Sequence, residues 1–405
     1  MSSSNDADTL APIGSTERIG ELDILRGFAL LGVFIVHFVG AGFYNLPLDP
    51  GQAELFEQAG ANRMALFVSD MFFYNKANTL FATLFGMGFW VMLERLEARG
   101  AAFSRIYLRR LFALFLLGAV NVFLIFPGDV LHEYALLGFV LFLLRKLPAS
   151  LMLGLGLILA IAGFYIEYIE SLLSIDAAAA WDRFNVIQAA AFADGGYLNW
   201  VWETGQAHVQ RDIIETAFLG WALYIFSRFL LGAWIIREGL IQRSEQLQSQ
   251  MRLLLLIILP LGLALEGSSM AILLGAIDGP EWLEELLHLL AAPTLAAGYA
   301  LALIVLFHSR WAKLVRVFAP VGRMALTAYV AHGAIFTLVY FPFGLDLLGY
   351  VSPTMAMGIA LMVYMGLTLF CHLWLRHYRF GPLEFLWRWA TYGKRPSFLL
   401  NQGRF

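Results

Sequence analysis

An arginine and a histidine stand inside a segment that is otherwise apolar enough to cross a membrane. The segment runs from Leu22 to His37 and contains Arg26 near its start. Ionisable side chains are costly in hydrocarbon and mark functional sites there. A histidine suits general-base work near neutral pH, and an arginine suits a phosphate group. We therefore predict His37 and Arg26 as catalytic residues.

The spacing of these two residues predicts a shared face of one helix. Eleven positions advance an ideal helix by about three turns and roughly 16 Å, so both side chains are expected to line one cavity, with His37 near the bilayer midplane. Two structural alternatives remain open, in which Arg26 reaches the lipid headgroups and His37 bonds a neighbouring helix. Asp23 is favoured at the helix start by the macrodipole, and it could also orient Arg26.

Further polar residues near or within apolar segments are candidates for substrate binding. Lys76 and Arg228 are expected to pair with acids or to line water, and His332 is expected to face the central cavity. Arg109 and Arg110 could contact phosphates, although arginines at such positions are commonly topology signals.

A short polar turn holds a second group of candidates. Asp129 follows a glycine, and that dipeptide is a strong turn signal, so Asp129 is given a structural or substrate-binding role. His132 and Glu133 stand close by. Because adjacent residues do not converge on one ion and no third ligand is evident, a zinc site there is not expected.

The composition indicates that this chain lies in a membrane. Of its 405 residues, 60% are hydrophobic, 15% aromatic and 14% charged, whereas a soluble domain carries about a quarter charged residues. We predict an all-α, polytopic membrane bundle. The net charge of -3 gives no indication of nucleic-acid binding, and the single cysteine, Cys371, excludes an internal disulfide and a cysteine metal cluster. No metal or redox cofactor is expected.

Apolar stretches of sufficient length recur about ten times. Arginines and lysines gather in alternate connections, together with both termini, so the positive-inside rule predicts an even number of spans and cytoplasmic termini. The predicted spans lie near 22–43, 65–92, 108–126, 130–145, 150–170, 212–236, 253–276, 284–307, 324–343 and 354–376.

The spans divide the chain into three predicted parts. Residues 1–17 are read as a disordered tail, 18–376 as the transmembrane domain and 377–405 as a cytoplasmic tail with a short helix. The connection 171–211 is predicted to face outward. Its aromatic residues indicate an interfacial helix, with a lid or a sugar-stacking platform as the alternative.

Several motifs resemble those of the YeiB-like family of bacterial inner-membrane proteins, also called domain of unknown function 418. The similarity extends from about residue 18 to 395. It rests on the segment 22–37, the lysine-containing stretch 75–89, the pair 109–110 leading to 128–135, and the stretches 228–232, 322–329 and 381–388.

This family is similar in turn to transmembrane acyltransferases, which move acyl groups from cytoplasmic acyl-CoA to sugars or other acceptors. In one large branch an arginine and a histidine with ten residues between them mark the first helix, as Arg26 and His37 do here. Many YeiB-like members carry asparagine where His37 stands, which favours catalysis in this chain. The resemblance implies a multi-pass protein of the bacterial cytoplasmic membrane, with acyl-CoA as donor.

Two other functions remain open from the sequence. A carrier or flippase for a small solute or lipid would use Lys76, Arg228, His37 and His332 as a proton- or anion-linked site. A non-enzymatic sensor or assembly protein would use the aromatic loop as a partner surface. The acyl group, the acceptor and the oligomeric state are left undetermined.

Overall fold

The structure is a computed structural model and describes residues 19–40, 60–100, 103–162, 165–166, 175–193, 196–215 and 217–400. The predicted tail 1–17 lies outside these residues. The described chain is helical, and no strand occurs in it beyond an isolated bridge between Tyr378 and Leu399.

The elements before residue 215 are α2 (Gly20–Val39), α4 (Gly60–Phe72), α5 (Lys76–Ala98), α6 (Phe103–Leu124), α7 (Leu131–Leu143), α8 (Ala149–Ala162), α10 (Ala177–Ala193), α11 (Tyr197–His208) and the π-helical turn η4 (Val209–Ile214). Those after it are α12 (Leu219–Arg237), α13 (Gln248–Leu273), α14 (Glu281–Phe307), α15 (Ala312–Val315), the 3-10 turn η5 (Arg316–Phe318), α16 (Ala319–Arg323), α17 (Ala325–Tyr340), α18 (Pro353–Trp374) and α19 (Pro382–Tyr392).

Seven of these helical segments are long and apolar enough to cross a membrane, and the bent pair of α15–α16 with α17 would make an eighth. The multi-pass, all-α prediction is confirmed. Each of the ten predicted ranges contains a helix, but α7, α8 and α17 have 13, 14 and 16 residues, which is short for about 30 Å of hydrocarbon. The count of ten therefore stays a prediction.

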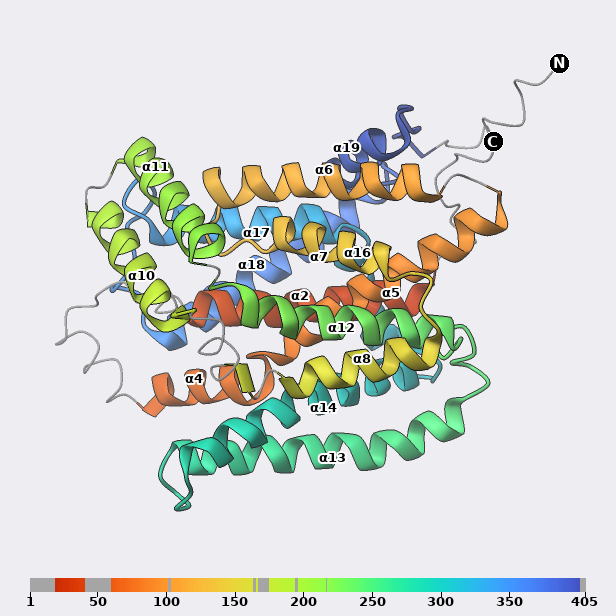
Figure 1. The fold of residues 1–405 in the computed structure, drawn as a ribbon, viewed down its shortest axis with the longest axis horizontal. Helices are drawn as coiled ribbons and strands as arrows, with labels where there is room; N and C mark the ends of the chain where they lie inside the picture. The colour runs from red at the N-terminus through yellow and green to blue at the C-terminus, as the bar shows by residue number, and fades with distance from the viewer. Residues whose placement is uncertain are drawn as a thin grey trace.

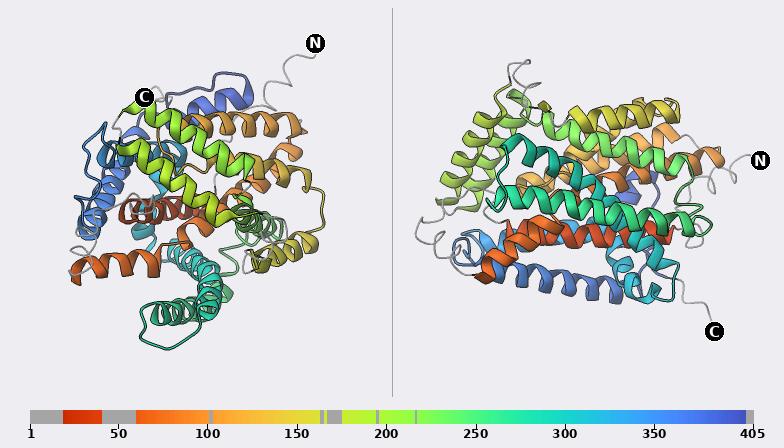
Figure 2. Two further views of the ribbon diagram at one scale, coloured as in Figure 1. Left: turned by 60° about the vertical axis from the view of Figure 1, so that its left-hand side comes forward. Right: turned by 90° about the horizontal axis from the view of Figure 1, so that it is seen from below.

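Helix α2 lies at the centre of the bundle, as Figure 1 shows. It packs against α5, α16, α17 and α18, while α12 packs against α5 and α8. The hairpin of α13 and α14 forms one edge of the molecule (Figures 1 and 2). The helix that carries Arg26 and His37 therefore has protein on several sides.

Glycines allow α2 to approach α16 closely. A Cβ on Gly322 would lie 1.7 Å from the carbonyl oxygen of Asp23, and one on Gly27 would lie 2.0 Å from that of Phe318. Small residues at such crossings let helix backbones touch in a membrane protein. This contact places Arg323, at the end of α16, beside the first turns of α2.

A break between α4 and α5 explains the polar residues in the predicted second span. Asn75 has a φ of 60°, in the left-handed region that asparagine tolerates better than most residues. The break turns the chain at residues 73–75, and α5 then begins with Lys76, whose side chain is fully buried. The polar group at 75–78 thus belongs to an interruption of the helix.

Different helices pack at the two ends of the bundle. Helix α19 contacts α6 and α17 at the end where α2 begins, and Trp387 of α19 lies over the guanidinium of Arg110. Helices α10 and α11 pack on each other at the opposite end (Figures 1 and 2). Of their tryptophans Trp200 is buried, whereas Trp202 is exposed. Predicted connection 171–211 thus contains a packed helix pair.

Candidate functional site

Two histidines from distant helices meet beside the centre of the bundle. Nδ1 of His37 lies 2.9 Å from Nε2 of His332, and Nδ1 of His332 lies 2.8 Å from the carbonyl oxygen of Tyr329. A carbonyl oxygen only accepts, so Nδ1 of His332 carries a proton. With both rings neutral, His332 accepts through Nε2 from Nδ1 of His37. This series of hydrogen bonds leaves Nε2 of His37 with a lone pair, as a general base requires.

His37 lines a cavity of about 380 Å³, which we call the histidine cavity. Its walls come from α2, α5, α7, α10, α11, η4, α12 and α17. The residues with ionisable or polar side chains that line it include Asn78, Asp129, Glu133, His208, Arg211 and Asp212, and aromatic rings that line it include Tyr74, Trp181, Phe184 and Trp221. Such a mixture suits a ligand with several hydroxyl or amino groups.

Arg26 lines a second cavity of about 210 Å³, the arginine cavity. Arg110, Arg323 and Arg388 line it as well, with Glu384 as an acid among them. The guanidinium of Arg110 stacks 3.5 Å from the centre of the Trp387 ring, which fixes its plane. Four guanidinium groups around one cavity suit a ligand that carries phosphates.

Three aromatic residues separate the two cavities. Phe81, Tyr134 and Tyr329 line both, and the ring of Phe81 lies 6.2 Å from that of Tyr134 and 6.3 Å from that of Tyr329. The prediction that Arg26 and His37 line one cavity is therefore wrong. Spacing along α2 places both on its inner side, but side chains of α5, α7 and α17 enter the space between them.

The other predicted arginines and Asp23 occupy different places in the structure. Asp23 is buried and its carboxylate lies 3.5 Å from the guanidinium of Arg26, so it orients that arginine. Arg110 lines the arginine cavity. Arg109 is exposed and lies against Gly393 at the end of α19, away from both cavities.

The polar turn before α7 is built around Asp129. Its carboxylate accepts a hydrogen bond from Asn121 at 2.7 Å and another from the backbone N–H of Leu131 at 3.0 Å. These bonds hold the start of α7 against the end of α6. Because Asp129 also lines the histidine cavity, its structural role and a binding role are compatible.

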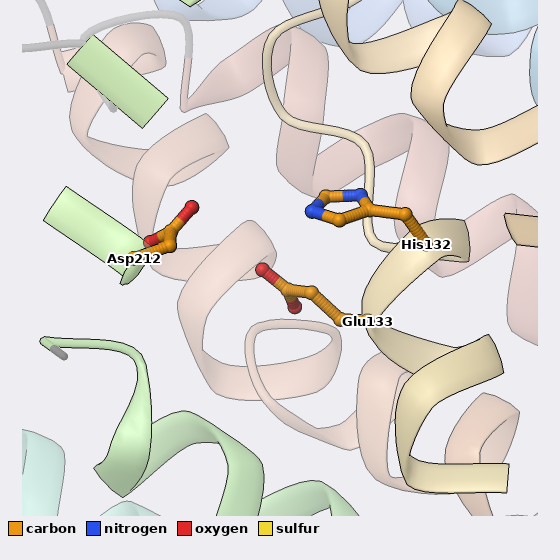
Figure 3. A group of neighbouring side chains, drawn as sticks. All are labelled: His132, Glu133 and Asp212. Carbon is orange, nitrogen blue, oxygen red and sulfur yellow. The ribbon is translucent and has the colours of Figure 1, made fainter. Parts of the chain in front are cut away.

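Asp212 of η4 lies beside His132 and Glu133, as Figure 3 shows, and Asp212 and Glu133 both line the histidine cavity. One ligand atom of each lies within 4.8 Å of the others. The prediction that no third ligand joins His132 and Glu133 is wrong in this respect, because η4 is brought in from 79 positions along the chain. Arg211 donates to both oxygens of Asp212, at 2.5 and 2.7 Å, so a metal ion would have to displace a guanidinium.

The carboxylate of Asp212 is held in its charged form. Burial alone would raise its pKa, but hydrogen bonds from His208 and Arg211 outweigh that and lower the pKa to about 2. Burial lowers the pKa of His208 itself. The guanidinium of Arg211 lies over the rings of Trp181 and Phe184, at 4.1 and 4.3 Å, which attaches α10 to this polar group.

Lys76 has an acidic partner that the sequence analysis did not identify. Its ammonium lies 2.5 Å from Glu266 of α13, and both side chains are fully buried. The ring of His288, on α14, lies 3.1 Å from the same carboxylate oxygen. Lys76 lines neither the histidine nor the arginine cavity. The sequence contained one signal for this pair, because Glu266 is the single carboxylate within the predicted span 253–276.

One further arginine and one acid are held by hydrogen bonds in the structure. Arg228 donates to the carbonyl of Tyr224 and to Ser227, and its guanidinium lies over the Tyr224 ring. Glu384 accepts from the backbone N–H groups of Leu326 and Thr327 at the start of α17. It thus caps α17, and burial raises its pKa despite these bonds.

Comparisons with known proteins find relatives that align along nearly the whole chain. The family described as "Protein of unknown function (DUF418)" matches residues 235–394. The chain is 32% identical to the uncharacterized protein YxaH of Bacillus subtilis over 405 residues, which covers 95% of this chain and 96% of that protein. It is 28% identical to the uncharacterized protein YeiB of Escherichia coli, over 93% of this chain and 96% of that protein. No solved structure matches.

Proposed function

The chain belongs to the DUF418 family, and we propose that it is a membrane-embedded acyltransferase that moves an acyl group from cytoplasmic acyl-CoA to an acceptor in the histidine cavity. The observation that carries this proposal is the arrangement of the two cavities. One is lined by four arginines and the other by a histidine with a free lone pair, and three aromatic side chains form a shared wall.

His37 supplies the base in this proposal. Nε2 takes the proton from a hydroxyl or amine of the acceptor, while the acceptor oxygen or nitrogen forms a bond to the thioester carbonyl carbon. The carbon–sulfur bond breaks, and the proton leaves with the CoA sulfur as a thiol. His332 stabilises the positive charge that His37 carries after it takes this proton, because Nε2 of His332 accepts a hydrogen bond from Nδ1 of His37 at 2.9 Å.

The arginine cavity holds the donor. Its volume of about 210 Å³ is below the range of about 300–1,000 Å³ typical of a whole ligand site. We therefore assign it to the phosphate-bearing part of acyl-CoA, with the nucleoside outside. Arg26, oriented by Asp23, and Arg110, held flat on Trp387, provide the charged contacts.

The acceptor side is the histidine cavity. Carboxylates of Asp129, Glu133 and Asp212 accept hydrogen bonds from hydroxyl or amino groups, while Trp221 and Trp181 offer flat apolar faces. Both kinds of contact suit a sugar or a similar polar acceptor. This proposal includes the bacterial inner membrane as the location, with the arginine cavity toward the cytoplasm.

Transfer requires the acyl chain to pass the aromatic wall. Rotation of Phe81, which is only partly buried, would open a route between the cavities past the buried Tyr329. The same wall favours the second candidate, a carrier, because two cavities divided by one movable barrier is the arrangement that alternating access needs.

The test measures binding and turnover separately in purified protein. Acetyl-CoA binding is followed by calorimetry, and acyl transfer by release of free CoA thiol with glucosamine, glycerol or ethanolamine as acceptor. We expect micromolar binding that Arg26→Ala abolishes. We expect His37→Ala to bind acetyl-CoA normally but to lose at least about 100-fold in turnover, the lower range for a general base.

Two exposed residues provide matched controls. Arg109→Ala removes an arginine that lies outside both cavities, and His372→Ala removes an exposed histidine of α18. Both variants are expected to behave as wild type. Absence of acetyl-CoA binding by correctly folded wild-type protein would overturn the acyltransferase and support transport.

A further inference from the structure

A third cavity, of about 320 Å³, lies beside the end of α2 and between α4, α13 and α14. Three carboxylates line it, those of Asp70, Glu266 and Glu284. Among the described residues in its lining there is no lysine or arginine. We call it the acidic cavity. The proposed acyl transfer assigns no role to these residues.

Glu266 lines this cavity, and one oxygen of its carboxylate has no hydrogen-bond partner. Lys76 and His288 both contact Oε1, at 2.5 and 3.1 Å. Oε2 is buried and has no hydrogen-bond partner in the structure, although the side chain is 0% exposed. An unsatisfied carboxylate oxygen in an apolar surrounding is costly, so it indicates a donor that the protein itself does not provide.

The ring of His288 lies between Asn75 and Glu266. The amide nitrogen of Asn75 donates to Nε2 of His288 at 2.9 Å, so the proton of the ring is on Nδ1 and points to Glu266. Lys76 forms a buried ion pair with Glu266. Asp70 and Glu284 remain as acids in excess on the lining, and Ser269 orients Glu284 by a 2.8 Å hydrogen bond.

Much of the rest of the lining is apolar. Val36, Val39, Leu66, Met270 and Leu273 surround the carboxylates, and the Tyr74 ring is stacked on His288 with centroids 5.8 Å apart. An aromatic face and carboxylates together attract organic cations. The cavity thus offers a charged end and a larger apolar part.

A metal ion does not fit this arrangement. Among the described residues, the one group of three or more histidine, cysteine or acidic ligands that converges within 4.8 Å is that of His132, Glu133 and Asp212. The three carboxylates of the acidic cavity are spread around about 320 Å³ and do not form such a group. A ligand that contacts them must have some length of its own.

We propose that the acidic cavity binds a small organic ammonium compound with an apolar body. The ammonium lies near the unpaired Oε2 of Glu266, the negative charges of Asp70 and Glu284 on the same lining attract it, and the body lies among the valine, leucine and methionine side chains. The cation is either a free amine or the amino headgroup of a lipid. Val36 and Tyr74 line the histidine cavity as well, so the bound ligand is its direct neighbour.

Binding is tested without any acyl donor, so the result is independent of the proposed acyl transfer. The probe is benzylammonium, measured by calorimetry on the full-length protein in a non-ionic detergent. Benzyl alcohol, which has the same ring without the charge, is the matched control ligand. We expect saturable binding of benzylammonium and at least tenfold weaker binding of benzyl alcohol.

The variants Glu284→Gln and Asp70→Asn remove single charges from partly exposed side chains, so folding is expected to persist. Each is expected to weaken benzylammonium binding about tenfold. Glu281→Gln, in the same first turn of α14 but exposed and outside the lining, is the matched control and is expected to bind as wild type. Thermal unfolding of each variant verifies folding. No saturable binding by wild type, or equal binding by all variants, would overturn the proposal.

A competition arm distinguishes the two sources of the cation. Short-chain phosphatidylethanolamine is added against bound benzylammonium, with short-chain phosphatidylglycerol as the lipid control. Displacement by the amino lipid alone assigns the site to a lipid headgroup. Retention of benzylammonium in both lipids assigns it to a free amine. Equal displacement by both lipids would show competition without recognition of the ammonium and would contradict the proposal.

Discussion

The arginine cavity and the histidine cavity share walls from α2, α5, α7 and α17, yet they have opposite chemistry. Four arginines and one glutamate line the first, whereas three carboxylates, one arginine and two histidines line the second. The side chains that divide them are Phe81, Tyr134 and Tyr329, which carry no charge. One set of helices thus presents a basic lining and a mainly acidic lining on the two sides of three aromatic side chains.

The two cavities also differ in how they are assembled. In the arginine cavity, the backbones of α2 and α16 touch at Gly27 and Gly322, and α19 covers the opening with Trp387. In the histidine cavity, the polar groups come from η4, the α6–α7 turn and the helix pair α10–α11. The first depends on close helix packing and the second on side-chain hydrogen bonds, so different substitutions should damage each one.

The largest effect is expected from Gly322→Ala, which should disrupt the arginine cavity alone. The added Cβ would lie 1.7 Å from the backbone oxygen of Asp23, so α16 must move away from α2 and take Arg323 with it. We expect a loss of about 3 kcal/mol, the upper part of the range for overpacking, and at least tenfold weaker acetyl-CoA binding. Thermal unfolding and calorimetry measure the two effects.

Gly358→Ala is the control for this variant, because nothing lies within 4 Å of a Cβ at that position of α18. It should leave acetyl-CoA binding unchanged and stabilise the helix slightly. Benzylammonium binding should survive in Gly322→Ala, which would show that the protein remains folded. Normal acetyl-CoA binding by Gly322→Ala would contradict the dependence of the arginine cavity on this crossing.

An intermediate effect is expected from His332→Leu, which should affect the histidine cavity alone. The variant removes the acceptor of the Nδ1 proton of His37, and hydrogen bonds to charged groups contribute about 1.5–3 kcal/mol. Turnover at saturating acetyl-CoA should fall about tenfold or more, with the dissociation constant for acetyl-CoA unchanged. His332→Gln restores an acceptor oxygen and should recover most of the rate. A rate loss that glutamine does not recover would argue against the histidine pair.

The smallest effect concerns the pH dependence of stability around the histidine cavity. Burial lowers the pKa of His208 in the folded state below its ordinary value of 6.5. As the pH falls below 6.5, the unfolded chain takes up a proton that the folded chain does not, so stability decreases. The midpoint of thermal unfolding should therefore drop between pH 7.5 and 5.5, by about 2–4 °C for each kcal/mol lost.

His208→Gln should make this pH dependence weaker, because glutamine does not titrate. His372→Gln changes an exposed histidine of α18 and should leave the wild-type dependence in place. An identical decline in wild type and His208→Gln would show that other groups cause it.

Much of the fold was predictable because apolar stretches are long and unambiguous. Each predicted span contains a helix, and the polar interruption at Asn75 and Lys76 marks a real break between α4 and α5. The lengths of α7, α8 and α17 were less predictable, since composition does not show where an apolar helix ends. The 78° bend before α17 has no clear signal in an apolar sequence.

The candidate site was predictable only in part. His37, Arg26, Arg110, Asp129 and His332 all line or adjoin the two cavities, because ionisable residues within apolar segments are rare and noticeable. Arg109, next to Arg110, faces outward instead, since the helix rotates by about 100° per residue. Asp212, which lies far from His132 and Glu133 in sequence, could not be placed beside them.

The sequence by itself determined that this is a multi-pass helical membrane protein, and it marked the residues whose charge is costly in hydrocarbon. Only the tertiary structure decided which of these residues meet: His37 with His332, Lys76 with Glu266, and Arg26 with Arg110 in a cavity that His37 does not share. The physical reason is that burial depends on local composition, whereas pairing depends on the rotation and crossing of helices that are far apart in the sequence.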